Sequence, residues 1–327
     1  MAKRGRAASA NAADGKSLRL RAAWLYHAHG LTQNDVADKL GLGRSTVIRL
    51  LEEAMRRGEV KIWIEGGEAD LIGLALQLEN ALGIGEVIVV PGADSFEDAA
   101  KSVGLALGKY LSGKITDDST IGVGWGRSLT ASLASFHPPA RSGVKVLSLL
   151  GGAVDTRFSN PGEFAWKFAS ALNAECYLFP APLIVNSAQT RRTLIEECGL
   201  HPIFRMAAKI DLAVVSAAGI DHKSGSYVRH LVSGREHAEL IKLGSVGDVL
   251  CNFIDAKGNT VDHPVNSRIM SVDLESLGKA RHVVLATGGR HRAAAILATA
   301  RRIRCHTLIT DEAAARAILG LVQSARA

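Results

Sequence analysis

The chain has 327 residues, of which 47% are apolar and 5% aromatic, and it carries a net charge of +7. Its length suits two domains with aliphatic cores and excludes the disordered and fibrous classes. We expect neither a membrane span nor a secretory signal, because no run of about 18 uncharged apolar residues occurs and no apolar segment follows the basic N-terminus.

The positive charge is concentrated near the N-terminus. The first 65 residues carry 12 Lys and Arg against 7 Asp and Glu, whereas the remaining 262 carry 27 against 25. Such a local excess indicates either a surface that meets nucleic acid or a solvated basic tail. The four cysteines lie far apart without a CxxC pair, which excludes a disulfide scaffold and a zinc ribbon and favours a cytoplasmic protein.

Three short helices are predicted within residues 17–66, after a basic segment, 1–16, that is expected to be disordered. Ser17 can cap the first helix, and Thr32 forms a capping-box pattern for the second, QNDVADKL. Gly41 breaks the second helix before the third, RSTVIRLLEEAMRR. This spacing is typical of a helix-turn-helix unit, and a helical hairpin with charged outer faces is the alternative.

The third helix of a helix-turn-helix enters the major groove with its N-terminal half. Arginine can bind a guanine edge there, and hydroxyl groups contact phosphates or bases. We therefore expect the DNA-binding residues to be Gln33, Arg44, Ser45, Thr46 and Arg49.

Two elements are predicted between this unit and the rest of the chain. The alternating segment EVKIWIEG predicts a strand, a possible wing, in which Lys61 and Trp63 share a face. Residues 67–84 then contain a linker helix with an apolar stripe of Leu71, Leu74, Leu78 and Leu82. The stripe either forms a seam between subunits or packs on its own domain.

Residues 85–327 alternate short apolar runs with helical patterns, which predicts a Rossmann-like α/β domain with a mainly parallel sheet. Ligands bind such sheets beyond the carboxyl ends of the strands. The expected strands are EVIVVP, STIGVGW, VKVLSLLGG, ECYLFPAPL, DLAVVSAAG, HVVLATGG and CHTLIT, and the expected helices are 96–112, 127–136, 161–172, 187–198, 200–208, 234–243, 290–301 and 311–320.

The segment GVGWGRS follows one of these runs and leads into a helix. Its glycines, Gly124 and Gly126, allow the backbone to approach an anion, and Arg127 and Ser128 add donors. The spacing is not the dinucleotide fingerprint GxGxxG, so we predict a site for a small phosphorylated molecule, with a structural turn as the alternative.

A second segment, ATGGRHR, has the same design, with Gly288 and Gly289 before Arg292. Asp248 is a candidate acceptor for sugar hydroxyls, and Asn160 precedes a predicted helix near the segment GGAVDT. The sequence AKGN predicts a hairpin turn. HExxH, GxSxG and Walker patterns do not occur, so we predict no catalytic residues, metal or cofactor.

Several strings, in this order, resemble the SorC family of sugar-binding bacterial transcriptional regulators over about residues 18–320. They are IGVGWGRSL, FPAPLIVNSAQTR, SVGDVLCNFIDAKGNTVDHPVN, ATGGRHRAAAI and LITDEAAARAIL. The resemblance implies a DNA-binding head and an effector domain with the fold of the glucosamine-6-phosphate deaminase and ribose-5-phosphate isomerase group. It also implies homotetramers and a phosphorylated sugar or related effector.

The resemblance further assigns site residues. The family's phosphate loop falls on Gly124, Gly126, Arg127 and Ser128, its acidic effector contact on Asp248, a polar position on Asn160, and a basic phosphate contact, often Lys, on Arg292 after Gly288 and Gly289. The chain departs from the family pattern at Asn186, where Asp is common, and at Leu150, where Asn is common, which affects the identity of the effector.

These observations predict a cytoplasmic regulator that binds double-stranded operator DNA of carbohydrate or polyol catabolic genes under control of a phosphorylated effector. Two alternatives belong to other classes. One is a sugar-phosphate isomerase or deaminase that carries a DNA-binding head, and it would need a general base such as Asp248 or Asp255. The other is an oligomeric DNA-binding scaffold without an effector.

Overall fold

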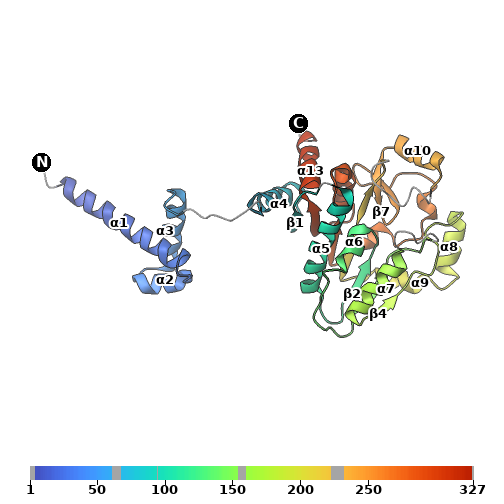
Figure 1. Ribbon diagram of the computed structural model, residues 1–327, viewed down its shortest axis with the longest axis horizontal. Coiled ribbons are helices and arrows are strands. Elements are labelled where there is room, and N and C mark those ends of the chain that lie inside the picture. The colour runs from blue at the N-terminus through green and yellow to red at the C-terminus, as the bar shows by residue number, and fades with distance from the viewer. Residues whose placement is uncertain (1–3, 61–67, 94, 154–159, 222–231, 326–327) are drawn as a thin grey trace. The chain divides into compact units, whose positions relative to one another are not determined.

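The computed structural model describes residues 4–60, 68–93, 95–153, 160–221 and 232–325 (Figure 1). The chain forms two compact units, Met1–Gly66 and Gly67–Ala327, and each is described by itself. None of the described helices is both long enough and apolar enough to cross a membrane.

The smaller unit contains three helices, α1 (Arg4–His27), α2 (Gln33–Leu40) and α3 (Arg44–Arg56). Helix α1 begins well before Ser17, so the structure differs from the expectation of disorder over residues 4–16. The physical reason is composition, because alanine has the highest helix propensity and five alanines lie between residues 7 and 13. Part of the predicted strand EVKIWIEG, including Lys61 and Trp63, lies outside the described residues.

The helix-turn-helix forms as the sequence predicts. The Thr32 hydroxyl accepts a hydrogen bond from the Asp35 N–H, and the Asp35 carboxylate accepts one from the Thr32 N–H, which completes the capping box. Gly41 ends α2 with φ 65°, a conformation that favours glycine. The close crossing of α2 and α3 buries Ala37 and Val47 in a core that all three helices share.

The larger unit contains a seven-stranded sheet with every neighbouring pair parallel, so the predicted sheet is confirmed (Figure 1). Its order is β1-β10-β9-β5-β2-β3-β4. The strands are β1 (Glu86–Val90), β2 (Thr120–Val123), β3 (Lys145–Ser148), β4 (Glu175–Tyr177), β5 (Leu212–Val215), β9 (His282–Ala286) and β10 (Thr307–Asp311).

Helices cover both faces of this sheet. One buried cluster joins the sheet to α5, α6 and α7, and the other joins it to α4, α9, α12 and α13. The helices are α4 (Glu68–Leu82), α5 (Phe96–Lys114), α6 (Arg127–Ser132), α7 (Pro161–Leu172), α8 (Ala188–Glu196), α9 (His201–Ala207), α10 (Gly234–Lys242), α11 (Leu274–Leu277), α12 (Ala293–Arg302) and α13 (Glu312–Ser324), with 3-10 turns η2 (Asn266–Arg268) and η3 (Arg290–Arg292).

The apolar stripe of α4 packs within its own unit. Leu74 and Leu78 are buried, and Leu71 and Leu82 pack against the same cluster. Of the two interpretations of this helix, the structure therefore shows packing on its own domain. Other apolar side chains of α4, Ile72 and Leu76, remain half exposed.

A small antiparallel sheet, absent from the sequence prediction, lies in the same unit. Its strands are β6 (Ala217–Gly219), β7 (Ser245–Val249) and β8 (Asn252–Asp255). The two residues between β7 and β8, Leu250 and Cys251, both have positive φ, 48° and 63°. Two-residue hairpins of the type I′ class require this conformation but favour Asn and Gly there. The predicted AKGN turn also forms, where the Gly258 N–H donates to the Asp255 carbonyl.

Candidate functional site

The first candidate site is the exposed half of α3. Val47, Leu51 and Ala54 are buried against α1 and α2, so the opposite face of α3 is turned outward. Arg44, Ser45 and Arg49 are exposed and Thr46 is half buried, and Gln33 accepts a hydrogen bond of 3.4 Å from Arg44 Nε. The structure thus brings all five predicted DNA-binding residues to neighbouring positions on α2 and α3.

The N-terminus of α3 has no side-chain cap. Its N-cap residue, Gly43, makes no side-chain capping hydrogen bond, and its first turn contains no acidic residue. The first N–H groups of a helix need acceptors, and their positive dipole end attracts phosphate. An uncapped N-terminus beside Arg44 is therefore suited to a DNA phosphate.

The second candidate site lies at the carboxyl ends of the neighbouring strands β2, β5 and β9. After β2, the Gly124 N–H donates to the Val214 carbonyl of β5 at 2.8 Å. Gly126 has φ 141°, and a Cβ there would lie 2.4 Å from Ser216 Oγ. Ser216 Oγ in turn donates to the Trp125 carbonyl at 2.6 Å. Gly126 is therefore required by this close approach of the two loops.

The glycine pair after β9 is fixed by the neighbouring strand β10. The Gly289 N–H donates to Asp311 Oδ2 at 2.8 Å, and a Cβ on Gly288 would lie 2.9 Å from the same oxygen. Thr310 Oγ1 donates to the Thr287 carbonyl at 2.7 Å. Asp311 also caps α13 through the Ala314 N–H, so one buried carboxylate positions the loop and the following helix.

Arg127 and Arg292 lie against the same aromatic ring. The central guanidinium carbon of Arg127 is 4.9 Å from the centroid of Phe96, and that of Arg292 is 4.2 Å from it. The His291 ring meets Phe96 edge to face, with centroids 5.4 Å apart. The arrangement brings two cationic groups from separate loops together through cation–π contacts. Phe96, the first residue of α5, was not among the predicted site residues, because a phenylalanine at the start of a helix carries no specific signal.

Asp248 is buried close to these loops. The Cys251 N–H donates to its Oδ2 at 3.1 Å, and Arg292 Nη1 donates to the carbonyl of Ala217, the strand partner of Val249, at 3.4 Å. Burial raises the pKa of Asp248 to about 7, although the Cys251 hydrogen bond and the Arg292 charge oppose this. At neutral pH this carboxyl group can therefore either donate or accept a hydrogen bond.

The strained hairpin connects Asp248 to the first glycine loop. A Cβ on Gly124 would lie 3.0 Å from Leu250 Cδ2, so the hairpin residue next to Cys251 packs directly on this loop. Ser128 is buried as the second residue of α6. The structure therefore assembles Gly124, Gly126, Arg127, Ser128, Asp248, Gly288, Gly289 and Arg292 at one edge of the sheet.

Asn160 has a structural role in capping α7. Its Oδ1 accepts from the Gly162 N–H at 3.1 Å, and its Nδ2 donates to the Ala153 carbonyl at 2.7 Å. These hydrogen bonds do not reach the two arginines. Asn160 lies beside Gly152, which follows β3, the neighbour of β2 in the sheet, and its contact with an effector stays a prediction.

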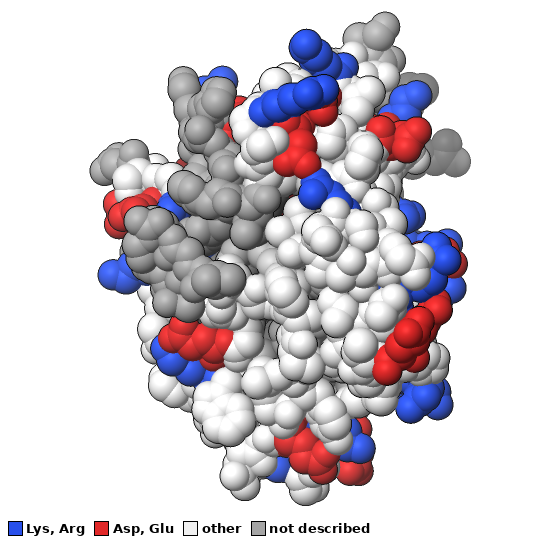
Figure 2. All heavy atoms as spheres, turned by 90° about the vertical axis from the view of Figure 1, so that its right-hand side faces the viewer, with Lys and Arg blue, Asp and Glu red and all other residues white. Residues whose placement is uncertain are grey.

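One face of the larger unit carries little local excess charge. On the face that Figure 2 displays, Lys and Arg side chains alternate with Asp and Glu side chains around a wide uncharged area. This distribution agrees with the near balance of charges after residue 65. An anion must therefore be held by individual arginines and backbone N–H groups rather than by a general field. No cluster of three metal-ligating side chains occurs among the residues with described positions.

Comparison with known proteins relates both units to regulators. Residues 69–320 match the family described as “Putative sugar-binding domain”, and residues 16–71 match the homeodomain-like domain family. The chain is 30% identical over 306 residues to the erythritol catabolism regulatory protein EryD of Brucella abortus, which covers 93% of this chain and 96% of that protein. It is 27% identical to the deoxyribonucleoside regulator of Bacillus subtilis, covering 93% and 97% of the two chains.

The fold agrees with these relationships. The full-length sorbitol operon regulator SorC of Klebsiella pneumoniae superimposes with a TM-score of 0.70, at 23% identity, over 94% of this chain and 99% of that one. These relatives are named as regulators, so the comparisons do not favour the isomerase or deaminase alternative. With its helix-turn-helix and its matched sugar-binding domain, the chain belongs to the SorC family of sugar-binding transcriptional regulators.

Proposed function

We propose that this protein is a cytoplasmic regulator of carbohydrate or polyol catabolic genes, whose affinity for operator DNA is set by a phosphorylated sugar or polyol. The names of the relatives support the assignment to carbohydrate or polyol catabolism. One is an erythritol catabolism regulator, another is a deoxyribonucleoside regulator, and a structural neighbour is a sorbitol operon regulator.

The proposal of a phosphorylated effector rests on one observation, that Arg127 and Arg292 both lie against Phe96. Each guanidinium presents several N–H donors in a plane that matches phosphate oxygens. The glycine loops beside them, at Gly126 and Gly289, leave the backbone without a Cβ barrier. A phosphate bound there would place the rest of a short sugar or polyol near Asp248, whose carboxyl group suits a hydroxyl.

The regulatory mechanism follows from linkage. An effector changes DNA affinity only if it binds two states of the protein with different affinity. A helix-turn-helix protein reads two half-sites as a symmetric oligomer, so we propose that the functional form is a homo-oligomer, a tetramer by family resemblance. The effector would then bias the arrangement of the subunits.

A thermal-shift screen tests the effector. The full-length protein is heated with erythritol, xylitol, sorbitol and ribose and with the monophosphate of each, because a specific ligand raises the unfolding temperature. We expect shifts with one or more monophosphates only, loss of the shift in Arg292→Gln, and its retention in the control Arg290→Gln, which alters a neighbouring exposed arginine. Equal shifts with the free polyols would contradict a phosphate site.

Operator binding is tested with the same protein. A labelled fragment of the promoter upstream of the protein's own gene is titrated with and without the compound that gives the shift. We expect the apparent affinity to change with the compound in wild type and to be unaffected by it in Arg292→Gln. Specific binding that never responds to the compound would support the scaffold alternative, and turnover of the compound would support an enzyme.

A further inference from the structure

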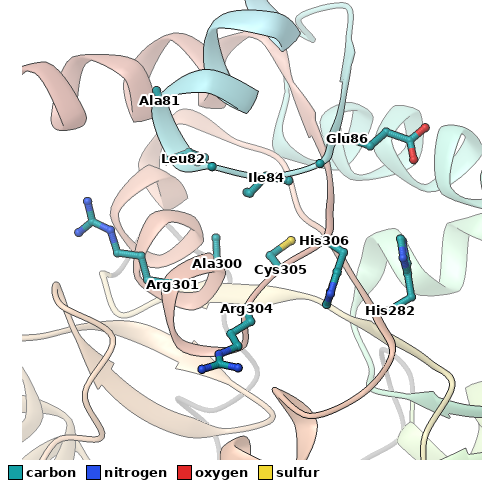
Figure 3. A pocket seen from close by; sticks show the side chains of 12 residues that line it. Ala81, Leu82, Ile84, Glu86, His282, Ala300, Arg301, Arg304, Cys305 and His306 are labelled. Atoms are coloured by element: carbon teal, nitrogen blue, oxygen red, sulfur yellow. The ribbon is translucent and has the colours of Figure 1, made fainter.

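A pocket of about 680 Å³ lies at the opposite edge of the sheet from the candidate effector site (Figure 3). Its wall includes the first residues of β1 and β9, Glu86 and His282, and the residue before β10, His306. Parallel strands place their amino ends at one edge, and the predicted site occupies the other edge. The volume is within the range of small-molecule pockets, about 300–1,000 Å³.

The pocket contains two arginines without anionic partners. Arg301 lies in the last turn of α12, and Arg304 follows that helix; Figure 3 shows the two side chains extending in different directions. Both are exposed, and within the described parts of the chain neither forms an ion pair. Figure 3 shows them on one side of Cys305, with His306 and His282 on the other. Among the described residues, no ion pair neutralises the positive charge that the two guanidinium groups give this opening.

The one acidic residue of the wall is already compensated. Glu86 accepts a hydrogen bond from the Tyr110 hydroxyl at 3.1 Å and forms an ion pair with Lys114 at 3.5 Å. The same tyrosine oxygen lies 3.0 Å from His282 Nε2 and 2.8 Å from Thr307 Oγ1. This network fixes Glu86 beside a lysine, so it leaves the charge of the two arginines intact.

His306 contributes an oriented donor. The Val283 N–H donates to His306 Nδ1 at 3.1 Å, so Nδ1 is an acceptor and the neutral ring carries its proton on Nε2. No acceptor for Nε2 is found in the described structure. The His282 and His306 rings stack with centroids 5.2 Å apart, which holds the His306 ring in this orientation.

Arg304 occupies a backbone position that favours glycine. Its φ is 50°, in the left-handed region, at the residue directly after the C-cap of α12. Glycine is the usual residue there because it adopts this conformation without strain. An arginine in this conformation is uncommon, which makes Arg304 a candidate for a functional role.

We propose that this pocket is a second anion site, which binds the phosphate group of a small phosphorylated metabolite through Arg301, Arg304 and His306 Nε2. The apolar floor formed by Leu82, Ile84 and Cys305 would accommodate the carbon skeleton of the metabolite. The site is separate from the proposed effector site and adds a second small-molecule input to the same unit.

Titration with inorganic phosphate at constant ionic strength tests the proposal. The wild-type calorimetric isotherm should require two classes of site. The variant Arg301→Gln/Arg304→Gly should lose one class, with at least a tenfold fall in affinity, and keep the other. It should still fold, because glycine suits the φ of residue 304. Arg292→Gln should show the reverse loss, and Arg205→Gln, which alters an exposed arginine of α9, should behave as wild type.

A direct signal from His306 distinguishes the two sites. In Arg292→Gln, phosphate should shift the imidazole ¹⁵N resonance of His306 Nε2, which His306→Gln identifies by its absence. Loss of this shift after Arg301→Gln/Arg304→Gly would support the proposal. An isotherm of that double variant identical to wild type, or a His306 resonance that phosphate leaves unmoved, would overturn it whatever happens at Arg292.

Discussion

Arg292 lies over the ring of Phe96, with its guanidinium carbon 4.2 Å from the ring centroid. Phe96 begins α5, whereas Arg292 follows β9, and Arg127 reaches the same ring from the start of α6, after β2. The ring therefore sets the spacing of two cations that repel each other. If the two arginines bind one anion together, as we propose, an uncharged residue sets their separation.

Replacing this ring should weaken effector binding without removing a charge. Phe96→Leu keeps an apolar side chain but loses the cation–π contacts, each of which is worth roughly 0.5–2 kcal/mol. We expect the affinity for the phosphorylated ligand to fall about threefold to thirtyfold, measured by calorimetry with the compound that the screen identifies. Trp166→Leu, a change at an exposed aromatic residue of α7, should leave the affinity unchanged. Unaltered affinity in Phe96→Leu would show that the ring does not position the arginines.

Arg49 should read sequence rather than phosphate. If its guanidinium binds a guanine edge, Arg49→Ala should cost roughly 1–3 kcal/mol at one base pair and relax specificity there. Binding to a set of single-substitution operators by fluorescence anisotropy measures this effect. The control is Arg57→Ala, because Arg57 follows α3 and pairs with Glu53. The same loss on every operator variant would instead assign Arg49 to the DNA backbone.

Asp248 should make the stability of the protein depend on pH. Because its pKa is about 7 in the folded state and near 3.9 in the unfolded chain, the folded state retains the proton over this interval. The carboxyl group therefore contributes stability at pH 4 that is lost as the pH rises to 7. Relative to wild type, Asp248→Asn should gain on the order of 4 kcal/mol across this range and change little above it.

Denaturant unfolding at a series of pH values measures this difference. The control is Asp255→Asn in the same hairpin, which should show the opposite sign. Although burial opposes it, hydrogen bonds from Asn259, Lys257 and Gly258 lower the pKa of Asp255, so its contribution is present at neutral pH and lost in acid. A constant difference between Asp248→Asn and wild type from pH 4 to 8 would contradict a raised pKa.

Two glycines of α5 should respond oppositely to alanine. A Cβ on Gly104 would lie 2.5 Å from both Ala131 Cβ and the Ser128 carbonyl oxygen, so Gly104→Ala must push α6 away. We expect a loss of about 1–3 kcal/mol in unfolding free energy and weaker effector binding. Gly113 meets nothing within 4 Å, so Gly113→Ala should add up to about 1 kcal/mol. Thermal unfolding of both variants compares them, and equal effects would exclude helix packing as the cause.

The sequence predicted the parallel sheet well because buried strands and their following loops have strong local signals. Apolar runs ended at the glycines and arginines of GVGWGRS and ATGGRHR, and the rule for parallel sheets placed both at one edge. The adjacency of β2, β5 and β9 then brought the predicted Arg127 and Arg292 together. Strand polarity alone placed both loops at one edge, whereas their proximity also depends on the strand order, which the sequence did not predict.

The parts that could not be predicted depend on distant contacts. Phe96 gains its role from two loops that lie far from it in sequence, and Asp311 from the glycine pair after β9. The hairpin at Leu250 and Cys251 could not be predicted from the sequence. Type I′ turns favour Asn and Gly, and neither occurs at these two positions. In each case the surrounding fold overrides the local preference of the sequence.

The packing of α4 determines where the DNA-binding unit of one regulator could be joined to the larger unit of another. Because Leu74 and Leu78 are part of the larger unit's core, that unit is whole only when it retains this helix. A chimera that joins a foreign DNA-binding head at residue 67 would keep both cores intact, whereas one joined after residue 84 would uncover an apolar surface on β1 and α13. The position at which regulators of this kind can exchange their DNA-binding units therefore precedes α4.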